Sequence, residues 1–343
     1  MKKVLVTGGC GYIGSHTVID LILSGYSVIS IDNFSNSDPS ILKRITDVTG
    51  VEVLNYPVDL CDASATAHIF ETHRDLAGVI HFAAFKAVGE SVEQPVRYFR
   101  NNLNSLLNVA EAVRAHGIPC FVYSSSCTVY GNPEKLPVDE KTPLQEATSP
   151  YGRTKQMGEQ ILHDVFLNQD TQVLSLRYFN PAGAHPSAKI GEAPGNTAQN
   201  LVPVITETAA GIRPELVVYG DDYPTRDGTC VRDYIHIMDL ARAHTLAFEA
   251  AGSKPLDRPV EYINLGIGEG VTVLEAIHAF EKVSGQKLNY RIGPRRQGDV
   301  IAIYANYARA KHILGWQPQY NIEDIMRSAW QWELNRKSSQ EVS

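Results

Sequence analysis

The first residues of the chain combine three features in an order that strongly constrains the fold. An apolar stretch covers residues 2–7, glycines stand at Gly8, Gly11 and Gly14, and a helical pattern runs over residues 16–23. Glycines allow a sharp turn and a close backbone approach, and the N-terminus of the following helix offers free N–H groups and the positive end of its dipole. This order of strand, glycine turn and helix predicts the start of a parallel α/β sheet that holds the pyrophosphate of a dinucleotide.

The next stretch indicates which dinucleotide is bound. Gly25 ends the helical pattern, residues 26–31 form a second apolar stretch, and Asp32 follows at its carboxyl end. A carboxylate at this place meets the 2′-hydroxyl of the adenosine ribose. It would repel a 2′-phosphate, and the next basic side chain is only Lys43, so a 2′-phosphate would find little positive charge. We therefore expect NAD and not NADP.

Composition excludes several classes of partner. The chain has 343 residues, of which 43% are hydrophobic, and this is enough for two lobes around substantial cores. A net charge of −7 provides no basic field for nucleic acid or for an anionic membrane. The five cysteines are scattered without a C-x-x-C pair, which favours free thiols in a reducing compartment over disulfides or a metal site. No apolar run approaches the length of a membrane span, so we expect a cytoplasmic protein with a small-molecule partner.

Strand-like and helix-like stretches alternate along the first 180 residues, which is typical of a parallel sheet covered by helices. Further strands are expected over residues 51–58, 78–84, 120–126 and 172–178. Ligand-binding groups in such sheets gather at the carboxyl ends of the strands, so the residues at these ends should face one crevice. These residues are Asp59, Ala83, Ser126 and Asn180.

The pattern changes after about Asn180, where proline and glycine become frequent. A helical pattern over residues 238–248 and an apolar stretch over 260–265 then resemble the first part again. We expect an α/β fold with a Rossmann-type doubly wound parallel sheet and a smaller C-terminal α/β lobe for the substrate. The expected domains are 1–180 for NAD, to which 233–265 returns, then 181–232 and 266–336 for the substrate, and a frayed tail over 337–343.

A second motif carries catalytic chemistry. Ser149 and Pro150 are typical of a helix start, so Tyr151 and Lys155 should lie one turn apart on one face. Positive charge from the lysine and from an oxidised nicotinamide ring would favour the phenolate that a general base needs. The pair alone would also fit a surface tyrosine beside a solvated lysine. Its combination with the glycine turn and with Ser126 at a strand end favours a catalytic site.

With these motifs the sequence resembles the extended short-chain dehydrogenase/reductases and, within them, the UDP-glucose (UDP-galactose) 4-epimerase family. The resemblance extends from Val4 to about Trp332. The segments that carry it are residues 7–16, 81–91, 124–131, 177–181, 220–239 and 294–299.

The resemblance implies a role for individual residues. Ser126, Tyr151 and Lys155 would form the catalytic group. The implied NAD contacts are Gly8, Gly11, Tyr12, Ile13, Gly14, Asp32, Asn33, Asp59, Leu60, Phe82, Ala83, Ala84, Lys86, Asn101, Tyr151, Lys155 and Phe179. The implied UDP-sugar contacts are Lys86, Ser126, Asn180, Asn200, Leu201, Val217, Val218, Tyr219, Arg232, Arg296, Asp299 and Ile303. Surface salt bridges are the alternative for the two arginines.

The implied activity is the NAD-dependent 4-epimerisation of UDP-hexoses through a transient 4-keto sugar, in a homodimer. In this family a tyrosine after the Gly-Asp dipeptide restricts the pocket to hexoses, and a smaller residue admits N-acetylhexosamines. Ile303 takes this position, and Tyr304 takes it if the alignment shifts by one residue. With Ile303 at the gate, UDP-N-acetylglucosamine and UDP-N-acetylgalactosamine would also be interconverted.

Two alternatives remain open at this point. A nucleotide-sugar 4,6-dehydratase or a sugar-acid decarboxylase of the same family would need an acidic residue where Cys127 and Thr128 stand. A non-catalytic dinucleotide-sensing protein would be expected to have lost Tyr151 or Lys155, and both are present.

Overall fold

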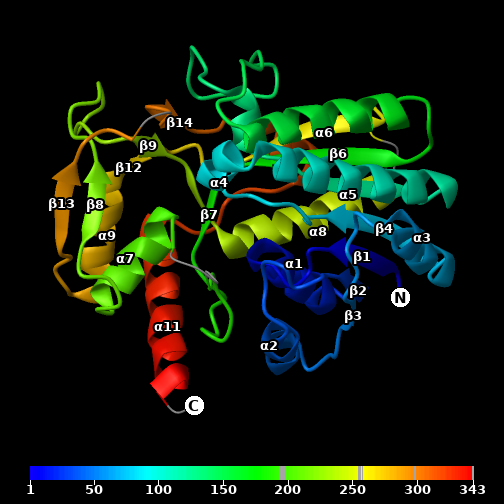
Figure 1. Ribbon diagram of the computed structural model, residues 1–343, viewed down its shortest axis with the longest axis horizontal. Coiled ribbons are helices and arrows are strands. Elements are labelled where there is room, and N and C mark those ends of the chain that lie inside the picture. The colour runs from blue at the N-terminus through cyan, green and yellow to red at the C-terminus, as the bar shows by residue number, and fades with distance from the viewer. Residues whose placement is uncertain (194–197, 254–255, 257, 297–298, 342–343) are drawn as a thin grey trace.

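The larger lobe is built on a seven-stranded, entirely parallel sheet (Figure 1). The computed structural model describes residues 1–193, 198–253, 256, 258–296 and 299–341. The strand order is β11-β6-β5-β4-β1-β2-β3. The strands are β1 (Lys3–Thr7), β2 (Ser27–Ile31), β3 (Leu54–Tyr56), β4 (Leu76–His81), β5 (Cys120–Ser124), β6 (Gln172–Tyr178) and β11 (Val260–Leu265). The order reverses between β1 and β4, as in a doubly wound Rossmann sheet, so the expected fold class is confirmed.

Helices cover both faces of this sheet because alternate strand residues are apolar on each side. Val4 and Val6 of β1 pack in one core cluster and Leu5 packs in the other. The first cluster is covered by α1 (Tyr12–Leu23), α2 (Ser40–Thr49), α8 (Ile237–Ser253) and α10 (Ala308–Leu314). The second is covered by α3 (Ala63–Thr72), α5 (Pro95–Ala115) and α6 (Pro150–Phe166), and α4 (Val88–Glu93) lies beside α5 and α6.

The smaller lobe lies beside the large sheet and has a core of its own (Figure 1). Its apolar side chains come from α7 (Leu201–Ala209), β8 (Leu216–Tyr219), α9 (Val273–Ser284) and α11 (Ile322–Glu341). Here β8 pairs in parallel with β13 (Tyr290–Gly293). Short strands connect the lobes: β7 (Asn180–Ala182) pairs with β10 (Tyr234–His236), and β9 (Val231–Arg232) pairs with β12 (Val271–Thr272) and β14 (Ala302–Ile303).

Helix α8 and strand β11 return to the large sheet. Strand β11 pairs with β6 along its whole length, and α8 packs against α1. Helix α11 extends to Glu341, so it includes residues 337–341 of the segment that we expected to be frayed. Residues 342–343 lie outside the described part of the chain. The division into two domains at the expected boundaries stays a prediction.

Several elements differ at their ends from the sequence expectation. Helix α1 begins at Tyr12, four residues before the expected start. Strands β4 and β5 end at His81 and Ser124, so the residues that follow them lie in loops. These loops hold the expected site residues Phe82 and Ser126 at the carboxyl edge of the sheet. In a loop their side chains do not have to follow the alternation of a strand, and ligands of such sheets bind at this edge.

Within the described residues, no helix has both the length and the apolar character that crossing a bilayer requires. The same part of the chain contains no group of three or more His, Cys, Asp or Glu residues placed to hold a metal ion.

Candidate active site

The glycine turn between β1 and α1 is packed so closely that two of its positions admit no side chain. Gly8 has a φ of +68°, and its N–H donates to the Ile31 carbonyl at 2.7 Å. A Cβ at Gly8 would lie 2.8 Å from the Ala83 nitrogen, and a Cβ at Gly14 would lie 2.0 Å from the Gly8 oxygen. The turn therefore lies directly against the ends of β2 and β4, where the sheet order reverses.

The N-terminus of α1 is suited to an anion. Its N-cap is Gly11, which offers no side-chain cap, and the first turn contains no acidic residue. The first N–H groups of a helix lack partners within the helix and carry the positive end of the dipole. A Cβ at Gly11 would contact only the Gly8 oxygen, at 3.3 Å. Backbone N–H groups can therefore approach a pyrophosphate here without obstruction.

Asp32 ties the end of β2 to the glycine turn. Its carboxylate accepts hydrogen bonds from the backbone nitrogens of Cys10 at 2.9 Å and Phe34 at 3.0 Å, and from the Ser37 hydroxyl at 2.8 Å. The following residue, Asn33, is exposed. These contacts hold the Asp32 carboxylate at the carboxyl edge of the sheet beside the turn, where a ribose hydroxyl would be recognised.

The remaining residues expected to contact the cofactor lie along the same edge. Asn102 fixes the loop after β4, because its side chain accepts from Phe85 N at 2.8 Å and donates to Phe85 O at 3.0 Å. The neighbouring Asn101 amide donates to the Asn102 side chain at 3.0 Å. Asp59 is exposed, whereas the Leu60 side chain is buried in the core and could offer a ligand only its backbone.

Lys86 and Tyr12 connect this edge to the segment after β7. The Lys86 ammonium lies 3.5 Å from Glu192 and 5.9 Å from the centre of the Tyr12 ring. The Tyr12 hydroxyl donates to the Gly183 carbonyl at 2.6 Å. Glu192 also accepts from the Asn200 amide at 2.8 Å. It therefore links Lys86, an expected NAD contact, to Asn200, an expected UDP-sugar contact.

Helix α6 carries the expected catalytic pair. Ser149 caps it by accepting from Gly152 N at 3.1 Å, and Pro150 occupies its first position, which confirms the predicted helix start. Tyr151 and Lys155 are 7% and 4% exposed, so neither is a surface side chain. The Lys155 ammonium donates to the Ser124 carbonyl at 2.6 Å and lies 5.9 Å from the centre of the Tyr151 ring.

Burial dominates the protonation of both side chains. It raises the pKa of Tyr151 well above its ordinary value, whereas a hydrogen bond with Ser126 acts in the opposite direction. Burial also lowers the pKa of Lys155 to about 7, and the negative charge of Glu159 partly opposes this. Burial therefore favours the neutral phenol of Tyr151, and the phenolate that we expect beside Lys155 and an oxidised nicotinamide ring stays a prediction.

The three serines at the carboxyl end of β5, Ser124 to Ser126, have separate partners. The Ser124 hydroxyl shares a 2.6 Å hydrogen bond with the Tyr178 hydroxyl, and Ser125 donates to Glu159 at 2.6 Å. Ser126 accepts from Thr128 N at 3.2 Å and caps the short 3₁₀ helix η1 (Cys127–Tyr130). The structure thus brings Ser126, Tyr151 and Lys155 together at the carboxyl end of β5.

Two arginines of the smaller lobe converge on one carboxylate. Arg296 makes contacts with Asp299 down to 2.7 Å, and Arg232 lies 3.8 Å from the same carboxylate. The Arg296 guanidinium also lies 5.7 Å from the centre of the exposed Tyr219 ring. Arg232 faces the loop over residues 125–128 that follows β5, which we call the catalytic loop. Burial raises the pKa of the Cys127 thiol in this loop to about 12, and Arg232 acts against this.

Other expected substrate residues differ in what they could offer. Val218 is buried in the core of the smaller lobe, whereas Val217 and Tyr219 on either side are more accessible. Asn180 donates its backbone N–H to the Asp233 carbonyl at 2.9 Å. Leu201 begins α7 directly after Asn200, which does not cap that helix through its side chain.

Ile303 and Tyr304 point to different surroundings. Ile303 pairs with Arg232 in the β14–β9 ladder and packs in a cluster with Tyr130 and Phe179, close to the catalytic loop. A Cβ at Gly270 would lie 3.0 Å from the Tyr304 ring, so Tyr304 packs on the side of the smaller lobe. Tyr304 directly follows Ile303, the last residue of β14, and successive residues of an extended chain point to opposite sides.

Some site residues escaped the sequence analysis. Glu159 and Arg177 form a buried ion pair next to Lys155, and Glu192 bridges Lys86 and Asn200. The i+4 spacing of Glu159 from Lys155 was the available signal for the first pair. Asp233 accepts hydrogen bonds from three backbone N–H groups between the lobes. Its position directly after Arg232 in the sequence did not indicate this role.

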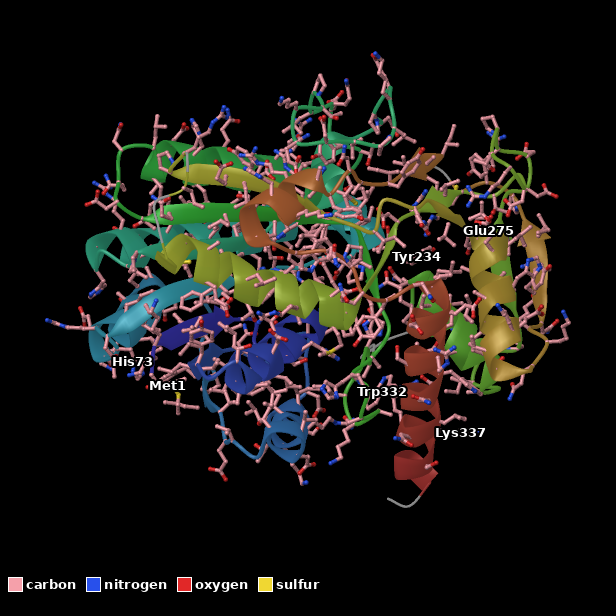
Figure 2. All side chains as sticks on the ribbon, turned by 180° about the vertical axis from the view of Figure 1, so that it is seen from behind. Met1, His73, Tyr234, Glu275, Trp332 and Lys337 are labelled. Atoms are coloured by element: carbon pink, nitrogen blue, oxygen red, sulfur yellow. The ribbon has the colours of Figure 1, made fainter. Side chains whose placement is uncertain are left out.

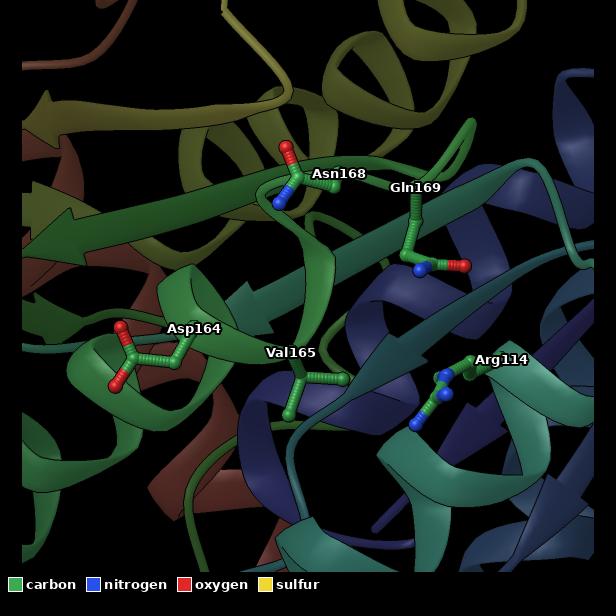
Figure 3. Close-up of a pocket in the computed structure, with 5 residues that line it drawn as sticks. All are labelled: Arg114, Asp164, Val165, Asn168 and Gln169. Atoms are coloured by element: carbon green, nitrogen blue, oxygen red, sulfur yellow. The ribbon is translucent and has the colours of Figure 1, made fainter.

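A surface depression of about 380 Å³ is separate from this site (Figure 3). It is lined by Arg114 of α5 and by Asp164, Val165, Asn168 and Gln169 at the end of α6. These residues precede β5 and β6, so the depression lies at the edge of the sheet opposite to the catalytic residues.

Known proteins resemble the chain over nearly its whole length. The model of the family described as GDP-mannose 4,6 dehydratase matches residues 5–329. The UDP-glucose 4-epimerase of Bacillus subtilis is 46% identical over 332 residues, which cover 96% of both chains. The structure of the UDP-glucose 4-epimerase from Bifidobacterium longum in complex with NAD+ and UDP has a TM-score of 0.93 and 43% identity, and the match covers 98% of this chain and 99% of the other. The UDP-Glc/GlcNAc 4-epimerase from Campylobacter jejuni has a TM-score of 0.83 and 34% identity, with 98% of this chain and 100% of the other covered. The chain therefore belongs to the extended short-chain dehydrogenase/reductase family and, within it, to the group of the UDP-glucose 4-epimerases.

Proposed function

We propose that this protein interconverts UDP-glucose and UDP-galactose by NAD-dependent epimerisation at C4 through a transient 4-keto sugar. The observation that carries this proposal is the meeting of Ser126, Tyr151 and Lys155 at the carboxyl end of β5, next to the glycine turn. The names of the full-length relatives support the same activity.

NAD fits the residues at the edge of the sheet. The uncapped start of α1 suits its pyrophosphate, and the Asp32 carboxylate suits an adenosine ribose with a free 2′-hydroxyl. Phe82, Ala83, Ala84 and Lys86 would line the path from the glycine turn toward the catalytic residues. When bound, NAD would supply the hydride acceptor for oxidation at sugar C4 and the hydride donor for the reduction that follows.

The chain's own residues would move the proton of the sugar hydroxyl. Tyr151 would take it from the 4-hydroxyl while Ser126 hydrogen-bonds the same oxygen, and Tyr151 would return it when the sugar is reduced. Because burial raises the pKa of Tyr151, the positive charge that favours its phenolate must act within this dry environment. The Ser124 carbonyl holds the Lys155 ammonium near the Tyr151 ring, where its positive charge can favour the phenolate.

Arg232 and Arg296 would clamp the pyrophosphate of the UDP-sugar. Guanidinium groups bind phosphate oxygens in a bidentate manner, and these two already share the Asp299 carboxylate as a partner. Asn180, Asn200, Leu201 and the strand Val217–Tyr219 would hold the uridine and sugar. A sugar tethered only through its pyrophosphate could turn within the pocket and present its opposite face.

Acceptance of N-acetylated sugars is the broader part of the proposal. Ile303 packs toward the catalytic loop and Tyr304 packs away from it, which favours Ile303 as the residue at the gate. Isoleucine leaves more room than the family's tyrosine. A structural relative is named a UDP-Glc/GlcNAc 4-epimerase, in agreement with this breadth.

The alternatives are less well supported. The matching family model is described by a 4,6-dehydratase, but Cys127 and Thr128 provide no acid at the position that elimination requires. A non-catalytic sensor of dinucleotides would not need a buried Tyr151 and Lys155 beside Ser126.

We also propose a homodimer in the cytoplasm. The family resemblance supports the dimer, and exposed apolar side chains on two helices that pack together, Leu107 on α5 and Met157 on α6, would suit such an interface. The free thiols of all five cysteines fit a reducing compartment.

Replacement of Tyr151 by Phe tests the catalytic role. The variant should lose most of its turnover with UDP-galactose, because it cannot accept the hydroxyl proton, while its affinity for UDP stays unchanged. The purified wild-type protein should be assayed against all four UDP-sugars without added NAD. Full activity of Tyr151→Phe would remove Tyr151 from the mechanism, and a wild-type protein inactive on every UDP-sugar would refute the proposed function.

A further inference from the structure

A buried ion pair lies next to the catalytic residues and has no part in the mechanism described so far. Glu159 on α6 and Arg177 on β6 both have side chains that are 4% exposed. The Glu159 carboxylate accepts from Arg177 Nε at 2.9 Å and from a terminal guanidinium nitrogen at 2.7 Å. A buried pair of this kind is weak evidence for a contribution to stability, since desolvation offsets the attraction.

Arg177 is itself fixed from several sides, so it can orient the carboxylate. Its guanidinium donates to the Tyr130 hydroxyl at 3.1 Å and lies 4.7 Å from the centre of the Tyr262 ring. The Tyr130 hydroxyl in turn donates to the Asn264 side chain at 2.6 Å. The pair is thus part of a rigid network that joins β6, η1 and β11.

Glu159 connects this network to the catalytic loop. Its carboxylate accepts from the Ser125 hydroxyl at 2.6 Å, and Ser125 N–H donates to the Leu176 carbonyl at 3.0 Å. On either side of Ser125, the Ser124 carbonyl binds Lys155 and the Ser126 hydroxyl caps η1. A change at Ser125 would therefore move both neighbours, and one of them, Ser126, would face the sugar C4 oxygen in the proposed reaction.

We propose that Glu159, oriented by Arg177, is a positioning residue for the epimerisation: it fixes Ser125 between Ser124 and Ser126, and it places a carboxylate one helical turn after Lys155 on the same face of α6. This inference rests on the proposed function and names two residues that support its catalytic group.

The electrostatic part of the role has a definite sign. Burial lowers the pKa of Lys155, and Glu159 raises it. Removal of the Glu159 charge should therefore lower the pKa of Lys155 further, and the ammonium would be lost at a lower pH. Among the described residues, the titratable or charged side chains that face Lys155 or Glu159 are Tyr151 from α6, His81 from β4, Tyr123 from β5, Arg177 from β6 and Tyr262 from β11.

Two variants separate the geometric part from the electrostatic part. Ser125→Ala removes the hydrogen bond and leaves the ion pair intact, so kcat for UDP-galactose should fall about 10-fold, as expected for one hydrogen bond, with an unchanged pH profile. Glu159→Gln retains an oxygen that can accept from Ser125 but removes the charge. Here kcat should fall about 100-fold, and the alkaline limb of the pH profile should move to lower pH by about 1 unit.

UDP affinity, measured by calorimetry, should stay at the wild-type value in both variants, because neither residue faces the substrate. If Glu159→Gln fails to fold because Arg177 is left unpaired, the neutral double variant Glu159→Gln/Arg177→Met takes its place and should show the same shift.

The outcomes separate this inference from the function on which it rests. An active wild-type enzyme with unchanged kcat and pH profile in the variants would overturn the inference alone. A parallel loss of kcat and UDP affinity with an unshifted pH profile would indicate a merely structural pair and would also overturn it. A wild-type protein inactive on UDP-sugars would overturn both proposals.

Discussion

Addition of one methyl group to Gly14 or to Gly11 tests two different requirements of the glycine turn. A Cβ at Gly14 would lie 2.0 Å from the Gly8 oxygen and 3.0 Å from the Gly9 Cα, so the turn itself would have to open. A Cβ at Gly11 would approach only the Gly8 oxygen, at 3.3 Å. Gly14→Ala therefore tests the packing of the turn, and Gly11→Ala tests the space in front of it.

The expected magnitudes follow from these distances. To reach ordinary contact at 3.4 Å from an alanine at position 14, the Gly8 oxygen would have to move by about 1.4 Å. Such overpacking costs about 1–3 kcal/mol, so Gly14→Ala should lower the apparent Tm by about 5 °C and prevent NAD binding. Gly11→Ala should keep its Tm, but the same cost would fall on the complex and weaken NAD binding roughly 10- to 100-fold.

The assay is calorimetric titration with NAD together with thermal unfolding of protein from which nucleotide has been removed. Gly89→Ala is the matched control, because Gly89 lies within α4 and a Cβ there would meet nothing within 4 Å. Wild-type NAD affinity in Gly11→Ala would refute the close approach of the pyrophosphate to this turn. A wild-type Tm in Gly14→Ala would refute the packing argument.

Three further predictions concern the substrate and the effect of pH. Ile303→Tyr should abolish activity on UDP-N-acetylglucosamine and spare UDP-galactose in parallel assays, and equal loss of both activities would contradict the gate. Arg296→Ala should weaken UDP binding roughly 10- to 100-fold by calorimetry, since it removes a charge-assisted contact. The control variant Arg295→Ala removes an exposed partner of Asp222 and should have little effect on UDP binding. Equal effects of the two variants would contradict the clamp. Burial lowers the pKa of His81 to about 3. As the pH falls, His81 is therefore protonated in the unfolded chain before it is protonated in the folded protein. The contribution of His81 to stability is complete above about pH 6.5 and is lost as the pH falls toward 3. Urea unfolding should therefore show about 2 kcal/mol lost through His81 between neutral pH and pH 5, and His81→Gln should remove this part of the slope.

Local patterns in the sequence were sufficient for the cofactor edge of the fold. The glycines before α1 and Asp32 after β2 are set by their immediate neighbours, and the structure places them at the reversal of strand order. Strand ends were harder to predict, because they depend on pairing with other strands: β5 pairs with β6 only up to Ser124, although β6 continues to Tyr178. Thus β5 ends at Ser124, and the loop that presents Ser126 begins there.

Contacts between distant segments could not be predicted in the same way. Arg232 and Asp299 are far apart in sequence and meet because β14 pairs with β9. The segment after β7 is anchored by the backbone carbonyl of Glu192, which accepts from Trp332 of α11 at 2.9 Å, and Figure 2 shows Trp332 on this helix. This contact places the Glu192 side chain within reach of Lys86 and Asn200. Such pairings depend on the packing of two lobes, about which a single sequence contains little local information.

The protonation of the catalytic pair shows most directly what spacing leaves out. The i, i+4 spacing of Tyr151 and Lys155 determines that they share a helix face, but their charges depend on how much water the surrounding elements exclude. In the folded protein the same burial raises the pKa of Tyr151 and lowers that of Lys155, so each side chain is driven toward its neutral form. Catalysis must then rely on groups that restore charge within the site, and Glu159 is the nearby residue whose charge acts on Lys155 in this direction. A tyrosine-lysine motif therefore becomes an active base only through the buried charges that the fold places around it.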